Sequence, residues 1–598
     1  MRRNHRMPFG TEIQTGGVRF RLWAPSATGV ELLVDGAEPR AMERLADGWC
    51  ELLEPMARPG SRYRFRIGGD LLVPDPASRY QPEDVQGPSM VVDPAEFQWE
   101  DGNWHGRPWE EAVLYELHIG AFTPEGSFAA VESHLDELAD LGVTAIELMP
   151  VADFAGRRGW GYDGVLPFAP DSAFGRPDEL KRLVQAAHAR RLMVFLDVVY
   201  NHFGPEGNYL HAYAAPFFTR RHHTPWGAAN NFDGPGSRAV RDFFIENALY
   251  WLDEYHLDGL RLDAVHAILD DSPKHFLVEL AERVRAAFAD RHVHLVLEND
   301  ANQARFLMAH LFDAQWNDDF HHILHVLATG ETAGYYRDYR KTPLQWLGRA
   351  LTKGFAYQGE PSEHRGGEPR GEPSAHLPAT RFVAFLQNHD QIGNRATGER
   401  LSALAAPEAL QAALAILLLC PSIPLLFMGE EWGSSQPFLY FCDFHAELGA
   451  AVREGRRREF EQFPQFADAE ARRRIPDPND EATFLGSKLD WTARSGPAGA
   501  ERLALVRRLL VLRHAEIVPR LKGLVAEAGF ALEEPHLLHA WWHLADGATL
   551  ALQANLGENA CQAAGPPQGR IIYTNHGGFA AGGRGDNLPP WTVTWCLA

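Results

Sequence analysis

Three carboxylic acids each end a short apolar run, and their type and spacing could serve the cleavage of a glycosidic bond. Asp263 ends the run Gly-Leu-Arg-Leu-Asp, Glu298 ends Leu-Val-Leu-Glu, and Asp390 lies in Asn-His-Asp. Burying an acid is costly, so an acid at the end of an apolar strand needs a reason to be there. Glycoside hydrolysis supplies one, because it uses one carboxylate as nucleophile and one carboxylic acid to protonate the leaving oxygen.

The surroundings of the first two acids suit different roles. Side chains alternate faces along a strand, so Arg261 and Asp263 share one face, and the arginine would keep the carboxylate ionised as a nucleophile requires. A purely structural salt bridge is the alternative. Glu298 follows apolar residues that would raise its pKa, which suits a general acid. For Glu298 alone, a solvated strand end is the simpler interpretation.

Histidines accompany these acids. His389 precedes Asp390, and His202 ends a fourth motif, Asp-Val-Val-Tyr-Asn-His, that has a similar composition. Either imidazole could donate a hydrogen bond to a sugar hydroxyl. One histidine near a strand end is more often structural, but four such motifs would converge if their strands formed one barrel.

The elements that would position these residues alternate between strand and helix. Eight apolar runs are candidate strands: 113–119, 143–149, 192–199, 259–263, 294–298, 312–316, 382–387 and 424–428. Stretches such as 177–191 and 238–255 have helical periodicity, and 412–419 reads as a buried helix. Eight strand-helix repeats predict a (β/α)₈ TIM barrel, in which the site forms at the carboxyl ends of the strands.

The flanking regions alternate with a period of two and predict β-domains. We expect an N-terminal β-sandwich resembling a carbohydrate-binding module over residues 1–98 and the barrel over 99–500. A C-terminal antiparallel β-domain is expected over 501–598. Two long insertions, 203–237 and 353–380, are rich in glycine and proline and interrupt the barrel. Long insertions in compact domains are commonly functional.

The composition narrows the class of protein. The net charge of −22 argues against partners such as nucleic acid or an anionic membrane surface. Five cysteines without a CxxC pair argue against a disulfide framework or a cysteine metal site, and they favour a reducing, cytoplasmic location. The basic start of the chain is not followed by an apolar segment, so neither a signal peptide nor a membrane span is predicted.

Together these motifs resemble the α-amylase superfamily, glycoside hydrolase family 13. The four motifs match its signature regions in order, and the resemblance covers nearly the whole chain. It implies Asp263 as nucleophile, Glu298 as general acid and base, and Asp390 as the acid that stabilises the transition state. It also implies that Tyr162, in Gly-Trp-Gly-Tyr-Asp-Gly, is an aromatic platform for the cleaved sugar. Without the resemblance, Tyr162 reads as a core aromatic.

Other stretches, including Trp316-Asn-Asp-Asp-Phe-His-His322, resemble those members that release trehalose from maltooligosyltrehalose. This resemblance implies a retaining hydrolase of an α-1,4-glucosidic bond, which would work in trehalose biosynthesis beside a maltooligosyltrehalose synthase. The substrate-binding residues that it implies, besides Tyr162, are Arg261, His266, His202, His389, Asp318, Asp319, Phe320, His321, His322, Gln391 and Asn394.

Several alternatives stay open at this point. A branching or debranching enzyme of the same superfamily would carry the same three acids, and a noncatalytic glucan-binding protein could keep the fold. No cofactor is expected. No metal is predicted, because residues 203–237 lack an Asp-rich calcium loop and no zinc-type spacing occurs. The oligomeric state is not predicted. From their position after the sixth barrel strand and before the seventh, residues 318–322 and the insertion 353–380 are expected to shape the acceptor side, although the individual residues that select the trehalose end stay open.

Overall fold

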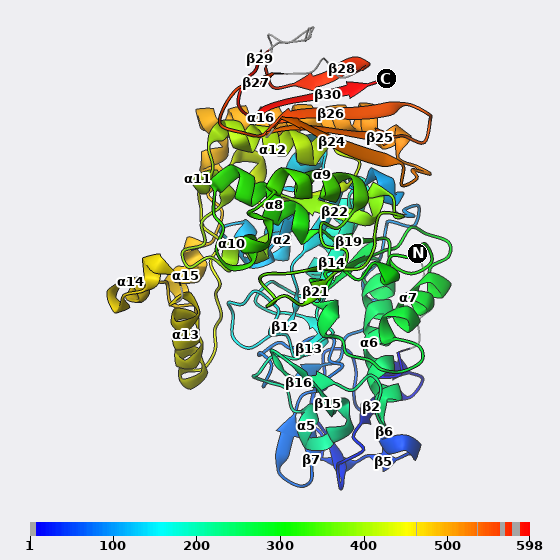
Figure 1. Cartoon of the computed structure of the whole chain (residues 1–598). Helices are drawn as coiled ribbons and strands as arrows, with labels where there is room; N and C mark the ends of the chain where they lie inside the picture. Colours follow the sequence, from blue (N-terminus) through cyan, green and yellow to red (C-terminus); the bar gives the residue numbers. More distant parts are fainter. Residues whose placement is uncertain (1–6, 462, 535, 563–567, 577–586) are drawn as a thin grey trace.

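The computed structural model describes residues 7–461, 463–534, 536–562, 568–576 and 587–598 of the chain. A small β-domain lies at one end of the molecule, a barrel occupies the middle, and a second β-domain caps the other end (Figure 1). This order matches the predicted organisation. The exact boundaries at residues 98 and 500 stay predictions, and the second of these lies within helix α16 (Pro497–Leu512).

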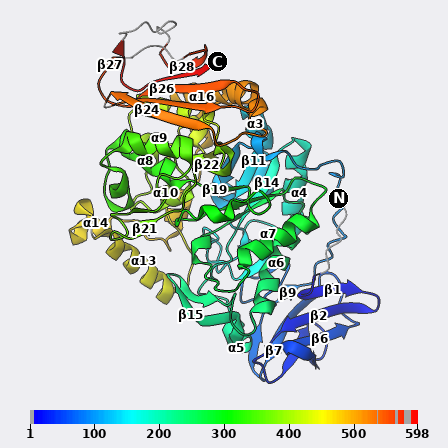
Figure 2. The same cartoon turned by 45° about the vertical axis from the view of Figure 1, so that its right-hand side comes forward.

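The N-terminal domain is a sandwich of two antiparallel sheets, which Figure 2 shows beside the lower part of the barrel. One sheet has the order β1 (Gly10–Gln14), β2 (Gly17–Trp23), β6 (Trp49–Glu54), β5 (Glu43–Arg44), and the other β4 (Arg40–Ala41), β3 (Val30–Val34), β7 (Arg62–Ile67), β8 (Leu71–Val73), with β9 (Ser89–Met90) paired to β7. Phe20 and Phe65 are fully buried between the sheets. The period-two pattern therefore predicted this sandwich correctly, because alternate side chains face its core.

The centre of the molecule is a closed barrel of eight parallel strands. In order they are β10 (Leu114–Leu117), β11 (Ala145–Leu148), β14 (Met193–Val198), β17 (Gly259–Leu262), β18 (His294–Leu297), β19 (Ala314–Trp316), β22 (Phe382–Phe385) and β23 (Ile423–Phe427). Every one of these residues is buried, since the strands face barrel core on one side and helices on the other. The eight predicted strands are confirmed.

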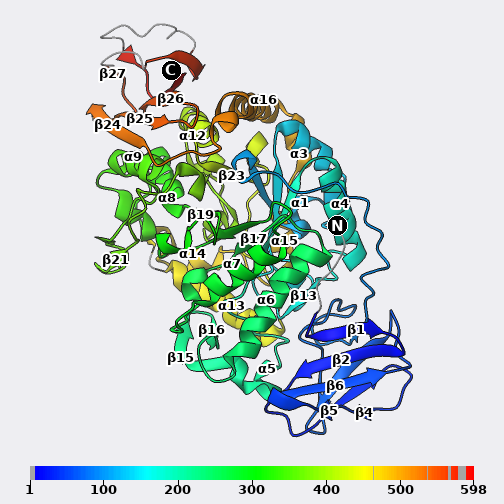
Figure 3. The same ribbon diagram turned by 90° about the vertical axis from the view of Figure 1, so that its right-hand side faces the viewer.

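Helices surround the barrel, and Figure 3 shows α4, α6 and α7 along one side. The longer ones are α4 (Pro177–Ala189), α6 (Ser237–Glu254), α7 (Phe276–Ala287), α8 (Asp318–Thr329), α9 (Pro343–Lys353), α12 (Pro407–Leu419) and α16. The shorter ones are α1 (Ile119–Phe122), α2 (Phe128–Glu132), α3 (Leu135–Leu141), α10 (His389–Gly393), α11 (Leu401–Leu404) and α15 (Glu481–Gly486). The helix predicted at 412–419 is the buried C-terminal part of α12. No helix of the described residues is long and apolar enough to cross a membrane.

Both predicted insertions are built around hairpins. Residues 203–237 contain α5 (Leu210–Tyr213) and the hairpin of β15 (Phe218–Thr224) and β16 (Gly227–Asn230). Residues 353–380 contain the short pair β20 (Glu360–Pro361) and β21 (Pro369–Arg370). A further pair, β12 (Ala152–Asp153) and β13 (Leu166–Pro170), follows β11. Helices α13 (Ala446–Phe460) and α14 (Ala469–Arg473) project from the left of the barrel in Figure 1.

The C-terminal domain is an antiparallel sheet laid over the barrel helices. Its strand order is β24 (Ala528–Glu534), β25 (Leu537–His543), β26 (Thr549–Asn555), β30 (Thr592–Leu597), β28 (Arg570–Thr574), and β27 (Cys561–Gln562) pairs with β29 (Asn587–Leu588). Trp542 and Trp595 are buried on its inner face, and their indole nitrogens donate to the carbonyls of Leu351 in α9 and Ala415 in α12. These two bonds and the apolar inner face fix the sheet on the barrel.

Candidate active site

Asp263 is held by donors from two neighbouring barrel strands. Arg261 donates through Nη1 to Asp263 at 2.8 Å, and to Asp197 at 2.6 Å, while Asn201 donates to the second oxygen of Asp263 at 3.0 Å. The pairing follows from register, because Arg261 on β17 lies opposite Asp197 on β14. Asp263 is 13% exposed, so its fixed, charge-paired carboxylate still faces the open end of the barrel. This arrangement suits a nucleophile.

Arg261 is fixed on its other side by an aromatic ring. Its guanidinium carbon lies 4.2 Å from the centroid of Trp316, the last residue of β19. A cation over an indole face is stabilised electrostatically, and the planar guanidinium can still donate along its edges. The ring and the two carboxylates together leave the arginine little freedom to rotate.

Glu298 lies at the carboxyl end of the next strand, β18. Its nearest arginine nitrogen is 3.9 Å away, and its Oε2 accepts a hydrogen bond of 2.5 Å from the backbone of Ala264. Ala264 has a φ of 41°, a left-handed conformation that alanine rarely adopts. Burial raises the pKa of Glu298 well above its usual value, and the negative charges of Asp263, Asp318 and Asp390 raise it further against the effect of Arg261. A carboxyl group kept protonated in this way suits a general acid.

Asp390 lies in the first turn of helix α10, just after β22. Its backbone N–H donates to the capping side chain of Asn388 at 2.9 Å, and Asn394 donates to its carboxylate at 2.8 Å. The side chain is exposed to solvent, but protein groups lie around it, as expected at the bottom of a concave surface. Burial in this concavity raises its pKa, while His389 and Arg261 lower it.

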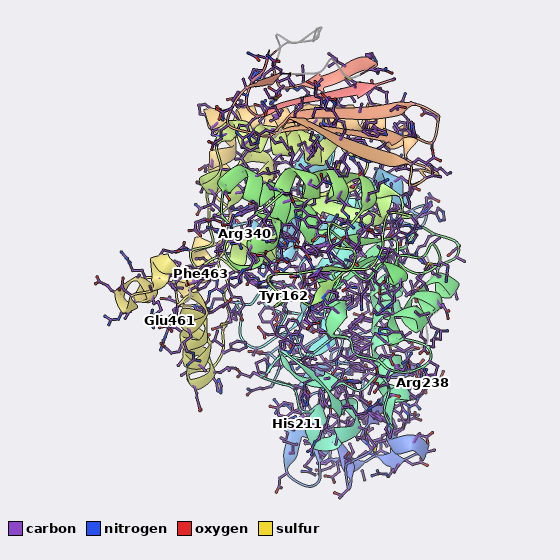
Figure 4. The ribbon with its side chains drawn as sticks, in the orientation of Figure 1. Tyr162, His211, Arg238, Arg340, Glu461 and Phe463 are labelled. Carbon is purple, nitrogen blue, oxygen red and sulfur yellow. The ribbon has the colours of Figure 1, made fainter. Side chains whose placement is uncertain are left out.

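Tyr162 and His389 form a stacked pair beside the acids. Their ring centroids lie 5.0 Å apart with planes inclined by 26°, and the Tyr162 hydroxyl donates to Asp197 at 2.6 Å. Burial lowers the pKa of His389, but its contact with the carboxylate of Glu116 at 2.5 Å outweighs this effect and leaves the pKa raised. Tyr162 lies in the middle of the molecule in Figure 4 and keeps part of its ring exposed. The geometry therefore leaves it able to act as a platform.

His202 and His266 lie at the ends of β14 and β17. His202 contacts the side-chain oxygen of Asn201 through Nδ1, and its ring stacks on Trp226 of the β15–β16 hairpin at 5.3 Å. Burial lowers the pKa of both histidines, which favours neutral imidazoles. The structure thus gathers two predicted contacts beside Asp263, and it adds Trp226.

The segment 318–322 divides between cleft and core. Asp318 is partly exposed, and its carboxylate lies 3.5 Å from the amide nitrogen of Gln391. Burial raises the pKa of Asp318 to about 7, with help from Asp300 and against the effect of Arg370. His322 retains 8% exposure. These residues stay candidates for substrate contact.

Asp319, Phe320 and His321 are at most 2% exposed, and this corrects their expected direct contact with a sugar. Asp319 accepts hydrogen bonds from the backbone of Ala356 at 2.7 Å and from Arg370 at 3.0 Å, both in the insertion 353–380. The helical period explains the difference, because only some side chains of α8 can face the cleft. We assign Asp319 to positioning the insertion, whereas Phe320 and His321 belong to the buried interior.

Sequence reasoning did not single out several residues of this site. Glu116, Asp197, Asn201 and Trp316 all bond or pack against the predicted residues. Each stood in a quoted motif or strand, and an acid inside an apolar strand, as in Leu-Tyr-Glu-Leu, was the available signal. Their partners lie far away in the sequence, so only the closed barrel reveals the contacts.

Among the described residues, one group of side chains could hold a metal ion: His222, Asp233 and Asp271. His222 lies 2.8 Å from Asp233, and Arg221 pairs with Asp233 at 3.2 Å and with Asp271 at 3.3 Å. The arginine pairs with both acids, so the group reads as an ionic tie between the β15–β16 hairpin and the segment before α7.

Family models match three parts of the chain. Residues 8–77 match the carbohydrate-binding module 48 (isoamylase N-terminal domain), 92–233 the α-amylase catalytic domain, and 526–595 a domain of unknown function, DUF3459. The three matches fall on the sandwich, the first part of the barrel and the C-terminal sheet. They support the expected superfamily but not one activity within it.

Whole-chain relatives decide the family. The malto-oligosyltrehalose trehalohydrolase of Deinococcus radiodurans is 45% identical over 84% of this chain and 82% of its own length. The chain belongs to the malto-oligosyltrehalose trehalohydrolase family. As a member of this family, it is a glycoside hydrolase. A 1,4-α-glucan branching enzyme of Corynebacterium efficiens matches only 43% of this chain and 38% of its own length, at 36% identity, which disfavours the branching alternative.

A solved structure supports the fold of this trehalohydrolase family member along its whole length. A protein of Salmonella typhimurium, provisionally assigned as an alpha amylase, is 46% identical and superposes with a TM-score of 0.94 over 99% of this chain and 100% of its own. The sandwich, barrel and C-terminal sheet are thus arranged in both as one unit.

Proposed function

We propose that the chain hydrolyses the α-1,4-glucosidic bond next to the terminal trehalose of maltooligosyltrehalose, with net retention, and releases trehalose. The observation that carries this proposal is the contrast between two neighbouring acids. Asp263 is fixed beside Arg261 and Asn201, whereas burial and nearby negative charges favour a protonated Glu298. One ionised and one protonated carboxyl group are what a retaining glycosidase requires. The relatives' name supplies the substrate.

In the first half of the proposed reaction, the bond to the leaving trehalose is broken. A carboxylate oxygen of Asp263 attacks the anomeric carbon, and Glu298 gives its proton to the glycosidic oxygen. The electron pair of the broken bond leaves with that oxygen, so trehalose departs as a neutral alcohol. Arg261 stays paired with Asp197, which keeps it in place as the charge on Asp263 is consumed.

In the second half, water releases the shortened maltooligosaccharide. Glu298, now a carboxylate, takes a proton from water as the oxygen of that water attacks the anomeric carbon, and Asp263 leaves as a carboxylate. Two inversions at one carbon give net retention. Asp390, in the first turn of α10 after β22, would stabilise the positive charge that develops on the sugar in both steps.

Residues around the acids would hold the sugars. Tyr162 offers a ring face, and His389 offers a donor to a hydroxyl group of the cleaved sugar. His202, a neutral imidazole whose Nδ1 faces the side-chain oxygen of Asn201, offers Nε2 as an acceptor. We propose that Asp318, His322 and the insertion 353–380 form the wall that meets the trehalose end. This insertion is tied to the catalytic strand ends, because Arg370 donates to the backbone carbonyl of Asp300 at 3.0 Å.

The substrate itself places the enzyme in a sequence of reactions. An enzyme must first convert the reducing end of a maltooligosaccharide into a trehalose unit, so we propose a maltooligosyltrehalose synthase as the functional partner, within trehalose biosynthesis. We also propose the cytoplasm as the location. All five cysteines are free thiols, as a reducing compartment maintains them.

A product assay tests the proposal. The protein is incubated separately with maltooligosyltrehalose and with a plain maltooligosaccharide of equal length, and the products are separated. We expect rapid release of trehalose from the first and slow cleavage of the second. Equal cleavage of both substrates, or the formation of new α-1,6 branches, would leave the roles of the three acids unchanged. It would show that the chain is an amylase or a branching enzyme instead.

A further inference from the structure

The outer face of the C-terminal sheet carries an aromatic ring that the proposed reaction does not use. Along β25 the side chains alternate, so Trp542 points to the barrel and Trp541 points outward. Trp541 is 37% exposed, whereas Trp542 is 2% exposed. An indole on a solvent-facing sheet surface is a large apolar group with no packing role toward the barrel.

The strands beside Trp541 leave room for its ring to lie flat. Its two cross-strand neighbours are Gly529 on β24 and Ala551 on β26. A Cβ added to Gly529 would meet ring atoms of Trp541 at 2.6 Å and 2.9 Å, so the indole lies directly over the β24 backbone. Small residues on both sides therefore contribute to the 37% exposure of the ring.

Polar side chains border this ring on the same face of the sheet. His539 lies 3.3 Å from the carboxylate of Glu533 and 3.5 Å from the amide of Gln553. On the other side, His543 lies 3.2 Å from the hydroxyl of Thr549. Gln553 is only 4% exposed, so its amide supports His539 from below the surface. The exposed border thus combines carboxylate, imidazole and hydroxyl groups, which can donate to and accept from sugar hydroxyls.

We propose that this surface, defined by Trp541, Gly529, His539, Glu533 and His543, binds an α-1,4-glucan chain outside the active site. A flat indole face matches the apolar face of a glucose ring, and the polar border matches its hydroxyl edge. The chain's net charge of −22 favours a neutral ligand over a polyanion.

The choice of α-glucan as the ligand rests on the proposed function, whereas the existence of the binding surface does not. The surface is separate from the barrel opening, because the inner face of the same sheet packs on α9 and α12. It would give the C-terminal domain a role in holding polymeric glucan near the enzyme.

A purely structural role for Trp541 is the competing explanation. An aromatic side chain that covers a cross-strand glycine stabilises a sheet, and that alone would account for the pair Trp541–Gly529. This role predicts that replacing the indole lowers stability without changing glucan binding. The two explanations therefore differ in a measurable way.

Affinity electrophoresis of the full-length chain through gels that contain glycogen tests the proposal. An Asp263→Asn background prevents cleavage, and dextran gels serve as the control polymer. We expect Trp541→Ala to weaken the apparent affinity for glycogen about three- to tenfold, the range that loss of one stacking contact would give. Gly529→Ala leaves the tryptophan but lifts its ring, and it should weaken binding as well. Leu532→Ala removes another exposed apolar side chain from β24 and should change nothing.

Residual retention through the N-terminal module or the cleft is expected in every variant. Unchanged glycogen affinity in both Trp541→Ala and Gly529→Ala, with a lowered melting temperature, would overturn the proposal and leave only the structural pair. Trehalose release from short maltooligosyltrehalose is measured in a second set of the same variants, in which Asp263 is retained. Because this readout does not depend on glycogen, failure of the proposed function is distinguished from failure of the surface.

Discussion

At the scale of single residues, Arg261 separates the acids of the cleft into two kinds. It donates to Asp197 and Asp263 within 2.8 Å, but it reaches Glu298 only at 3.9 Å. The close carboxylate is charge-paired, while the distant one is dominated by burial and by its acidic neighbours. Distance from the arginine is not sufficient by itself, because burial raises the pKa of Asp197 to about 6 although it lies 2.6 Å from Arg261. Asp263 differs from Asp197 in its exposure of 13% and in the second donor, Asn201.

The raised pKa of Glu298 predicts how activity depends on pH. The general acid must carry its proton, so activity should fall as the pH rises through the pKa of Glu298.

We expect Glu298→Gln to lose most activity on maltooligosyltrehalose, by roughly 10³-fold. Its first step should recover on a glycosyl fluoride, whose leaving group needs no proton. Steady-state and burst kinetics on both substrates measure this. An equal loss on the two substrates would contradict the role.

Glu147 is a second buried acid, and the mechanism does not use it. It lies opposite Glu116 in the barrel register, is 1% exposed, and neither of its oxygens has a hydrogen-bond partner among the described residues. Burial raises its pKa well above the usual value, with contributions from Glu116 and Asp197 against that of Arg261. It is therefore favoured as a neutral acid.

This shift predicts a pH-dependent effect of Glu147→Gln on stability. Below a pH of about 4.5 the acid is protonated in both states, and above it the unfolded chain ionises first, so stability is lost as the pH rises toward the folded pKa. The glutamine variant lacks this loss. Its melting temperature relative to the parent should therefore rise between acidic and neutral pH, whereas Glu558→Gln, an exposed control, should show no trend. A pH-independent difference would refute this account.

At the scale of elements, helix α8 joins the cleft to the insertion 353–380. Asp318 faces the cleft, and its neighbour Asp319 holds the insertion through Ala356 and Arg370. Arg370 also pairs with Asp300, two residues after Glu298. The insertion is therefore an ordered wall attached to the catalytic strand ends.

Loosening this wall should alter the choice of substrate more than bond cleavage. The carboxylate of Asp319 faces only hydrogen-bond donors. In Asp319→Asn, the amide nitrogen cannot accept from these donors, so the insertion should detach. We expect the preference for maltooligosyltrehalose over plain maltooligosaccharide to fall on the order of tenfold in kcat/KM, about 1.4 kcal/mol. Glu368→Gln, exposed on the same insertion, is the control. An unchanged preference, with a lowered melting temperature confirming the disruption, would assign specificity elsewhere.

At the scale of the whole molecule, the C-terminal sheet is attached by large buried aromatics. Trp542 and Trp595 stack with centroids 5.6 Å apart, and each donates to a helix of the barrel. The attachment covers α12, a helix with apolar residues on all sides, which needs cover on its outer face. The sheet and barrel should therefore unfold together.

Removal of one of these indoles tests that coupling. Trp595→Ala should cost about 3–5 kcal/mol, because it leaves a cavity and removes the indole hydrogen bond to the carbonyl of Ala415. Chemical denaturation followed by far-UV circular dichroism and by release of trehalose should show one common shift to lower denaturant. If activity persisted after the sheet had unfolded, the two parts would be independent.

The sequence by itself determined the eight barrel strands, the flanking sheets and the three acids, because hydrophobic periodicity and residue type are local properties. It could not determine which side chains meet. Asp319 and His321 stood in a recognisable motif, yet helix geometry buries them, and Glu116 and Asp197 reach their partners only where distant strands close the barrel. The tertiary structure also decided that Trp541, rather than Trp542, faces solvent over Gly529. Contacts between residues far apart in the chain depend on register and closure, and no local pattern encodes these.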